Sequence, residues 1–458
     1  MLKRYFGDRK FNRRILLFSF PVVVHGFITS AINFIDSLMT GMLEDTAVGA
    51  VAAASRFFMI LLYAVGGMSG TTGVYISQFY GASRKKEIRQ SFYAGIIVTY
   101  GMLIPFFILL ILRPDKIISF FSHDPDIIRE GIVYVRIVKY SFIPLCLSLC
   151  ISSGLQAIGL TRIPLVVSGV SVIVKVVSNL LLMYGNSVLP WSGVTGAAVA
   201  TVITRVAELI MYLCAIALTK PEFVNGVKGF VDVPLSLAKR IVITAIPFSV
   251  NNIAWAAGNS VILKIYGNLG TDNYNAYVIL TAIDDIFFNF NASYGNANSV
   301  LIAQQIGKDD RDKAREFAYK TYGLALIVGV VLCVVLYLMK YSIPLIYSSM
   351  SDEVVSIAAR LTVLQSVTFI LYEMSMQNYY VFMAGGDTRS IAIMDSCMVW
   401  FVQIPILYIC AHYLNFSIET IFLGSQSAEL IKLFLSTALM KKERWLNPLA
   451  AVSVIEST

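Results

Sequence analysis

An apolar segment near the start of the chain carries polar side chains at helical spacing. His25, Thr29, Asn33, Asp36 and Thr40 follow one another at intervals of 4, 4, 3 and 4 residues, which places all five on one face of a helix. A charged group within a membrane-spanning helix costs roughly 2.5–3.5 kcal/mol unless it faces protein or water. We therefore expect Asp36 to face the interior and to exchange a proton for a bound ion or substrate. A carboxylate held by hydrogen bonds near the end of the helix is the alternative.

A second polar face lies farther along the chain. Ser171, Lys175, Ser178 and Asn179 belong to one apolar segment, and the ammonium group of Lys175 lies about one helical turn from Asn179. An ammonium at this position can pair with Asp36 and take the place of a bound sodium ion. The alternative is a lysine whose ammonium extends to the membrane interface, although position 175 lies near the middle of its segment.

The next apolar segment extends this polar surface. Arg205 and Glu208 share a helix face with Thr201, and together with His25 they are candidate substrate-binding residues. A structural salt bridge is the alternative, because Glu208 corresponds to Glu429 in the second half of the chain. If the cations of the first half face a cavity, they favour an anionic or zwitterionic substrate.

Polar residues are also concentrated in two segments of the second half. Asp285 and Asn289 belong to a segment with too many carboxyl and amide groups for a helix that faces lipid on every side. Glu373, Gln377 and Tyr380 form one stripe of a later segment, among aromatic and methionine side chains that adapt to irregular apolar ligands. We predict that both sets bind substrate. Ordinary core packing is the alternative for the second set.

No pattern in the chain indicates an enzyme. The 3 histidines are far apart, and the sequence has no HExxH motif, no P-loop and no nucleophile elbow. The 6 cysteines form no CxxC pair, so we interpret them as small apolar fillers. We therefore predict no catalytic residues, no metal site and no cofactor. Without an ATP-binding motif, the energy for any transport must come from an ion gradient.

The elements that position these residues follow from the composition. The chain has 57% hydrophobic and 14% charged residues with a mean hydropathy of +0.72, unlike a soluble domain. Apolar runs of about 20 residues match a hydrocarbon layer about 30 Å thick, and the alternation typical of membrane barrels is absent. We predict an all-α polytopic membrane protein. Its 12 transmembrane helices are expected at 15–42, 46–78, 91–112, 132–154, 162–184, 193–218, 239–266, 273–305, 318–339, 357–383, 390–413 and 416–440.

Lysine and arginine are concentrated in every second loop. Basic residues precede the first span and recur at 84–89, 220–240, 308–320 and 441–444. Because basic short loops stay on the cytoplasmic side, both termini are predicted to be cytoplasmic. The first span is too long for a signal peptide, so we expect it to be retained. The net charge of +8 is explained by these loops, and no nucleic-acid partner is predicted.

The two halves of the chain repeat one another. A shift of 226 residues aligns Pro21 with Pro247, Asn33 with Asn259, Gln78 with Gln304, Gly81 with Gly307, Arg89 with Arg315 and Gly159 with Gly385. Matches at one offset over this length indicate two homologous halves of six spans. Because six is even, the halves are parallel repeats related by a pseudo-two-fold axis along the membrane normal, with a central cleft and alternating access. We assign 1–218 to an N-lobe, 219–237 to a cytoplasmic linker and 238–458 to a C-lobe.

Several segments are similar to the multidrug and toxic compound extrusion (MATE) transporter family, within the multidrug/oligosaccharidyl-lipid/polysaccharide flippase superfamily. They are NFIDSLMTG (33–41), GVYISQFYGA (73–82), GLTR (159–162), GVTGAAVAT (193–201) and GGDTR (385–389). The segment 193–201 is the most specific, since it carries small residues at helix-packing spacing. The resemblance covers nearly the whole chain. It implies two six-helix lobes that export amphipathic organic molecules, often cations, coupled to inward proton or sodium movement.

The resemblance also implies roles for residues of the first half. Asp36 matches the N-lobe coupling acid of the family, and Asn179 matches an amide position. Lys175 departs from the pattern, because the family places an amide or acidic side chain at this position, whereas an ammonium can pair with Asp36 where a bound sodium ion would otherwise lie. Sodium coupling is therefore doubtful, and a proton-operated switch of Asp36 and Lys175 is favoured.

These observations lead to one expected function and one alternative. We expect a monomeric multi-pass antiporter of the cell membrane that exports small amphipathic compounds or drugs, with a proton rather than sodium as coupling ion. The predicted cation-coupling residues are Asp36, Asn179, Lys175 and Asn33. The predicted substrate-binding residues are His25, Arg205, Glu208, Asp285, Asn289, Glu373, Gln377 and Tyr380. The alternative is an exporter or flippase of an anionic or zwitterionic metabolite or lipid-linked precursor.

Overall fold

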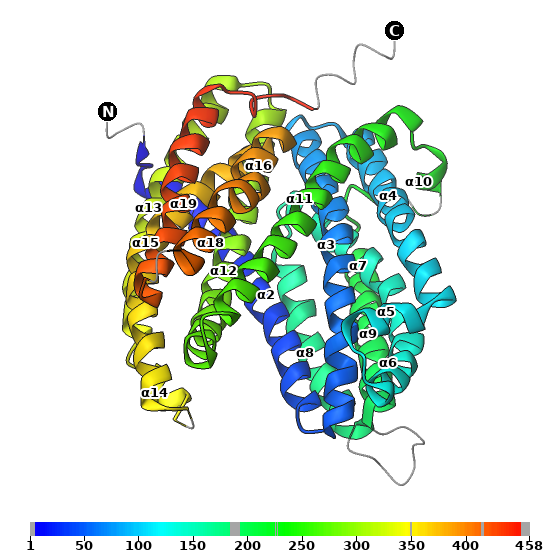
Figure 1. The fold of residues 1–458 in the computed structure, drawn as a ribbon. Coiled ribbons are helices and arrows are strands. Elements are labelled where there is room, and N and C mark those ends of the chain that lie inside the picture. Colours follow the sequence, from blue (N-terminus) through cyan, green and yellow to red (C-terminus); the bar gives the residue numbers. More distant parts are fainter. Residues whose placement is uncertain are drawn as a thin grey trace. The chain divides into compact units, whose positions relative to one another are not determined.

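The computed structural model describes residues 5–183, 193–224, 226, 228–348, 350–413 and 416–449, except for the side chains of residues 33, 34, 37 and 45. The predicted coupling residue Asn33 thus has its side chain outside the described part. The first half forms α2 (Arg9–Thr40), α3 (Asp45–Gly81), α4 (Lys85–Leu112), α5 (Pro114–Phe121), α6 (Pro125–Val138), the 3₁₀ turn η1 (Lys139–Ser141), α7 (Phe142–Ala157), α8 (Arg162–Leu182) and α9 (Gly193–Thr219). The second half forms α10 (Lys228–Val231), α11 (Leu235–Gly267), α12 (Thr271–Gly307), α13 (Arg311–Met339), α14 (Ile343–Ile346), α15 (Asp352–Ala384), α16 (Thr388–Met394), α17 (Ser396–Met398), the π-helical turn η2 (Val399–Gln403), α18 (Ile404–His412) and α19 (Ile418–Lys441), as Figure 1 shows.

Most of these helices are suited to a bilayer. Ten helical stretches of the described residues are long and apolar enough to cross a membrane, with α6 to α7 and α16 to α18 each counted as one. Two further helices, α12 and α19, have 37 and 24 residues but carry more amide and charged side chains. The predicted all-α polytopic fold is confirmed.

The bounds of the helices preserve the repeat of the sequence. Helices α3 and α12 both have 37 residues, and they begin at Asp45 and Thr271, which are 226 positions apart (271 − 45). Helices α4 and α13 also begin 226 positions apart (311 − 85). In the turn before each, Ser83 and Asp309 adopt left-handed backbone with φ of 57° and 59°, a conformation that is uncommon outside glycine. The basic turn after the second span of each half therefore follows the same backbone path.

Packing divides the chain into two compact units, which do not begin and end with the helices. One unit is Phe20–Ser249, and the other comprises the described residues before and after it. The first part of α2 thus belongs to the unit of the second half, and the first part of α11 belongs to the unit of the first half. The division of the sequence into 1–218, 219–237 and 238–458 stays a prediction.

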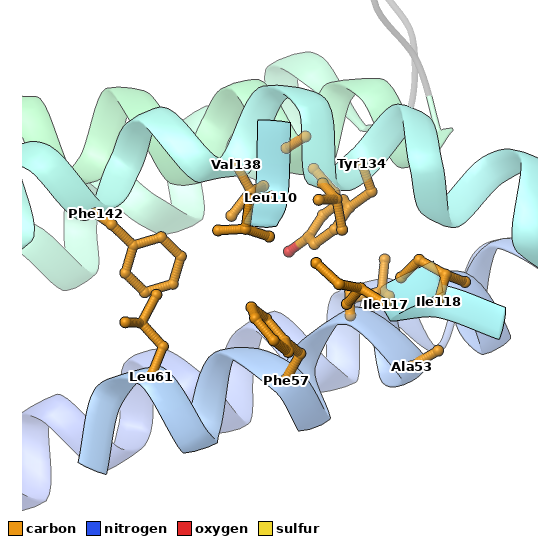
Figure 2. Packing of buried hydrophobic residues seen from close by; sticks show 14 of the residues in the cluster. Ala53, Phe57, Leu61, Leu110, Ile117, Ile118, Tyr134, Val138 and Phe142 are labelled. Carbon is orange, nitrogen blue, oxygen red and sulfur yellow. The ribbon is translucent and has the colours of Figure 1, made fainter. Parts of the chain in front are cut away.

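The unit Phe20–Ser249 has an apolar core around α3. Figure 2 shows Phe57 and Leu61 of α3 facing α6 and α7, with Phe142 pointing toward Leu61. Tyr134 and Val138 of α6 contribute to the same cluster. Because lipid tails are as apolar as these side chains, close packing and interhelical hydrogen bonds hold such helices together more than the hydrophobic effect does. This core fixes α6 beside α3, and with it the position of the Tyr134 hydroxyl.

Candidate functional site

An ion pair joins α2 and α8 within the unit Phe20–Ser249. The Lys175 Nζ atom lies 2.7 Å from Asp36 Oδ1 and donates a hydrogen bond of 2.7 Å to Thr201 Oγ1 of α9. Asn179 Nδ2, one turn from Lys175, donates to Asp36 Oδ1 at 3.2 Å. The Lys175 side chain is 3% exposed and that of Asp36 is 24% exposed. The structure therefore brings together three of the four predicted cation-coupling residues, in the pairing that the sequence predicts for Asp36 and Lys175.

The sequence of α8 explains why this lysine points inward. Ser171, Lys175 and Asn179 recur every four residues and are all buried, whereas large apolar residues between them, such as Ile173 and Val177, are exposed. One face of α8 is thus suited to protein and the other to lipid. Lys175 belongs to the protein face, so its ammonium is held by partners within the unit and does not extend to an interface.

Close packing of α8 and α9 places Thr201 next to Lys175. A Cβ atom at Gly196 would overlap the carbonyl oxygen of Leu182, so only glycine permits the approach of the two backbones. Gly196 belongs to the small-residue segment 193–201, for which the sequence predicts helix packing. That segment therefore serves the ion pair: it sets the distance at which a side chain of α9 accepts a hydrogen bond from α8.

Two polar groups at the pair complete its chemistry. The buried Asn179 Oδ1 atom accepts no hydrogen bond from the described residues, although Asn179 Nδ2 is engaged. Tyr134 of α6 is buried and lies beside both Thr201 and Asp36. A single tyrosine in an apolar segment does not indicate that it lies at an ion pair, and the sequence reasoning did not predict this position of Tyr134. The site thus holds one carboxylate, one ammonium and neutral groups that donate or accept hydrogen bonds.

A second charged pair lies on α9. Arg205 Nη1 is 2.7 Å from Glu208 Oε2, and both side chains are mostly buried. His25 of α2 lies near Glu208 and near the backbone of Pro164, and its buried Nδ1 atom has no hydrogen-bond partner among the described residues. The three predicted substrate-binding residues of the first half are therefore close together, and the cations Lys175 and Arg205 each have an acid beside them.

The predicted substrate-binding residues of α15 are packed against α12. Asn291 Nδ2 of α12 donates to the Glu373 carboxylate, and Asn298 Nδ2 donates to Gln377 Oε1 at 3.0 Å. The ring of Tyr380 also lies against α12. These three side chains are buried, which explains why the polar helix α12 can lie within a membrane. Their role in substrate binding stays a prediction.

The other two predicted residues of the second half lie elsewhere on α12. The Asp285 side chain is exposed, and Asn289 is partly exposed. Asn289 Nδ2 donates to the backbone oxygen of Asp285 at 2.7 Å, a bond within the helix. The structure therefore does not place these two residues in the buried network of Asn291 and Glu373.

The second half contains a charged cluster around Lys432, a residue that the sequence reasoning did not single out. Lys432 Nζ of α19 lies 3.7 Å from Asp395 Oδ1 and 3.6 Å from Glu429 Oε1. Asn251 Nδ2 of α11 donates to Asp395 Oδ2 at 2.9 Å, and Ser375 Oγ donates to Glu429 Oε2 at 3.2 Å. The signal was available: Lys432 is a lysine in the middle of an apolar segment, the same feature that singles out Lys175.

The eleventh span is interrupted at this cluster. Asp395 separates α16 from α17 with φ of −110° and ψ of −86°, and the π-helical turn Val399–Gln403 follows. The backbone N–H of Ser396 donates to Asn251 Oδ1 at 3.3 Å in place of a carbonyl of its own helix. Non-helical backbone at membrane depth requires such a partner within the protein.

The described residues contain no group of three or more His, Cys, Asp or Glu side chains arranged to hold a metal ion. The groups capable of ion chemistry are instead the paired charges described above. Within the described residues, long apolar helices that bury charged and amide side chains between them are typical of a multi-pass membrane protein with a polar interior.

Comparisons with known proteins agree with this class. A sequence model of the MatE family matches residues 21–181 and 247–409. The chain is 22% identical over 431 residues to the probable multidrug resistance protein YoeA of Bacillus subtilis, with 92% of each chain covered. It is also 22% identical over 425 residues to the probable multidrug resistance protein NorM of Bacillus cereus, with 91% of this chain and 92% of the relative covered. The chain therefore belongs to the MATE family, whose members are transporters and not enzymes.

Solved structures show the same fold. An outward-facing multidrug resistance MATE transporter has a TM-score of 0.85 at 14% identity, with 99% of this chain and 98% of the other covered. The Vibrio cholerae transporter VcmN in its bent form has a TM-score of 0.85 at 15% identity, with 95% and 97% covered. A Pyrococcus furiosus transporter, described as having a binding pocket of reverse polarity, has a TM-score of 0.85 at 14% identity, with 96% and 97% covered.

Proposed function

We propose that this protein is a proton-coupled antiporter that exports amphipathic organic compounds or drugs by alternating access, with Asp36 as the proton-accepting group. The observation that carries the proposal is the buried contact of 2.7 Å between Lys175 Nζ and Asp36 Oδ1. An ammonium in this position fills the place of a metal cation beside the carboxylate, which disfavours sodium. The names of the relatives, multidrug resistance proteins, support drugs as substrates.

The exchange follows from the partners of the two charges. Protonation of an Asp36 carboxylate oxygen removes the attraction to Lys175, whose ammonium keeps its hydrogen bond to Thr201. Asn179 can serve both states of Asp36, because its amide offers a donor to the carboxylate and an acceptor to the protonated acid. Protonation thus releases Lys175 from Asp36, while Asp36 keeps Asn179 as a hydrogen-bond partner. The released ammonium then repels a cationic substrate from the site.

Two further features complete the proposal. The basic loops support an orientation with both termini in the cytoplasm, and we take the transporter to act as a monomer with lobes at 1–218 and 238–458. His25, Arg205 and Glu208 are proposed to bind substrate in the first half. Asp285, Asn289, Glu373, Gln377 and Tyr380 are proposed to do so in the second.

The test is transport by the purified protein in proteoliposomes. The uptake of a fluorescent amphipathic cation, ethidium, is followed while a proton gradient or a sodium gradient is imposed separately, with the membrane voltage clamped by potassium and valinomycin. We expect the proton gradient to drive ethidium movement in the unaltered protein, and Asp36→Asn to abolish this response. The matched control is Asp115→Asn, which removes the same charge from an exposed position of α5.

Two results would contradict the proposal. If Asp36→Asn, purified as a monodisperse protein, responded to the proton gradient as the unaltered protein does, Asp36 would not be the coupling acid. If only the sodium gradient drove ethidium in the unaltered protein, the assignment of the proton would be wrong.

An exporter of anionic or zwitterionic compounds is the second candidate. The cations Lys175 and Arg205 favour it, but each is neutralised by an acid at 2.7 Å, and Arg56 is exposed. We therefore rank it below cation export. Lys175→Gln separates the two: an anion exporter loses transport of an anionic dye, whereas a cation exporter still transports a cationic dye.

A further inference from the structure

A basic cavity lies where the start of α2 meets the start of α13. It has a volume of about 220 Å³ and is lined by eight residues, four of which are the cations Arg14, Lys308, Lys313 and Lys320. These come from three places in the chain: α2, the turn after α12, and α13. In Figure 1 the blue start of α2 lies beside the yellow-green α13, and the contact of Phe11 with Phe317 confirms that they touch.

The cavity has an excess of positive charge. Glu316 lines it and pairs with Lys320 at 2.5 Å, and Asp310 pairs with Lys313 at 2.8 Å. Hydrogen bonds from the Lys313 side chain and backbone hold the pKa of Asp310 below its usual range, so this carboxylate stays ionised. Arg14 and Lys308 form no ion pair within the described residues. Two positive charges therefore remain unbalanced, which suits an anion with one or two negative charges.

An aromatic wall fixes the shape of the cavity. The rings of Phe11 and Phe317 meet edge to face with centroids 4.8 Å apart, and both line the cavity. Lys320 Nζ lies 5.6 Å from the centre of the Phe11 ring, within the range of a cation–π contact. This packing holds the start of α2 against α13, so Arg14 stays beside the lysines of the other elements. Basic residues that only set the orientation of a membrane protein do not need to be held together by aromatic packing.

The surface beyond the cavity is apolar on both helices. On α2, Leu16 and Leu17 are exposed within one turn after Arg14, and on α13 the exposed residues include Val330, Val331 and Val334. Val330 is ten positions after Lys320, or about 15 Å along a helix. A molecule with a charged head and apolar chains can place its head in the cavity and its chains along these residues.

We propose that this cavity binds a phosphate-bearing anion, with the headgroup of an anionic phospholipid favoured over a free phosphate by the apolar surface beside it. In the proposed orientation the cavity opens at the cytoplasmic side of the membrane, where basic pockets between membrane helices recruit such headgroups. The inference requires membrane insertion, which family membership establishes, and does not depend on the coupling ion.

The experiment measures binding to the purified full-length protein in a neutral detergent. Thermal unfolding and native mass spectrometry are recorded with added phosphatidylglycerol, with phosphatidylcholine, and with inorganic phosphate at matched ionic strength. The test variant is the double substitution Arg14→Gln with Lys308→Gln. The matched control is Lys86→Gln with Lys228→Gln, two exposed lysines outside the cavity and on the same predicted side of the membrane.

We expect phosphatidylglycerol to bind and to stabilise the unaltered protein and the control, and its apparent affinity to fall at least about tenfold in the test variant. Stabilisation by inorganic phosphate, but not by the lipid, that is lost in the same variant would confirm the anion site and identify its ligand as soluble. Equal binding of the two lipids by the unaltered protein, without an effect of phosphate, would overturn the proposal. Equal losses in the test and control variants would do the same, because the effect would then come from overall charge.

Discussion

Replacing Lys175 with methionine tests the ion pair most directly, because methionine keeps an unbranched side chain and removes the charge. In the native protein Asp36 Oδ1 has two donors, Lys175 Nζ at 2.7 Å and Asn179 Nδ2 at 3.2 Å. Lys175→Met leaves only the second. Removing one partner of a buried ion pair costs about 3–5 kcal/mol of unfolding free energy. Because Asp36 is 24% exposed, water can solvate part of the carboxylate, and we expect about 2–3 kcal/mol.

The assay is a double-mutant cycle of Lys175→Met, Asp36→Asn and both together. The free energy of unfolding of each purified variant is measured by denaturant titration in mixed micelles. In the Asp36→Asn background, Lys175→Met leaves no carboxylate without its cation. The loss of unfolding free energy caused by Lys175→Met should therefore be smaller in that background. We expect a coupling energy of at least about 1 kcal/mol between the two positions.

One outcome would refute this reasoning. If Lys175→Met destabilised the protein equally with aspartate and with asparagine at position 36, the two side chains would be energetically independent. The cost would then come from the packing of α8, and the contact of 2.7 Å would not describe the interaction that holds Lys175.

Three further predictions follow from other contacts. Lys175→Gln frees a site beside the carboxylate for a metal cation, so a sodium gradient should acquire an effect on ethidium transport that the unaltered protein lacks. Gly196→Val, whose side chain would overlap the backbone of Leu182, should separate α8 from α9 and cost about 1–3 kcal/mol in the same titration; Gly169→Val, on an uncrowded face of α8, should cost less. Lys432→Met leaves two mostly buried carboxylates without their cation. It should lower the free energy of unfolding by about 3–5 kcal/mol, more than Lys175→Met does. Equal effects of the two lysine substitutions would contradict the last prediction.

Much of the fold and part of the site could be predicted from local patterns. Apolar length fixes where a helix can cross a bilayer, and the repeat offset of 226 recurs in the starts of α3 and α12. The pairing of Asp36 with Lys175 was also predictable, because each is an ionisable residue on the polar stripe of an otherwise apolar helix. A charge in that position has few ways to avoid lipid, and an opposite charge of a nearby helix is one of them.

What could not be predicted depends on contacts between distant segments. Tyr134 reaches Asp36 and Thr201 only because α6 packs in the core around α3. The interruption at Asp395 has no proline or glycine that would indicate it in the sequence. Its missing helical partner is replaced by Asn251 Oδ1, which accepts from the backbone N–H of Ser396, 145 positions later in the chain. Sequence periodicity describes one helix at a time, and these features arise when two helices share a hydrogen bond.

The interruption at Asp395 has a mechanical consequence. Asn251 donates to the Asp395 carboxylate and accepts from the backbone N–H and the hydroxyl of Ser396. These hydrogen bonds link α11 to the interruption between α16 and α17. Separating these two elements would leave the Asn251 amide and the backbone N–H of Ser396 without their hydrogen-bond partners in a buried site, which costs free energy. We therefore expect the two elements to move together. We expect the span from α16 to α18 to bend after Ser396, at the π-helical turn Val399–Gln403, whose backbone hydrogen bonds are less regular than those of an α-helix.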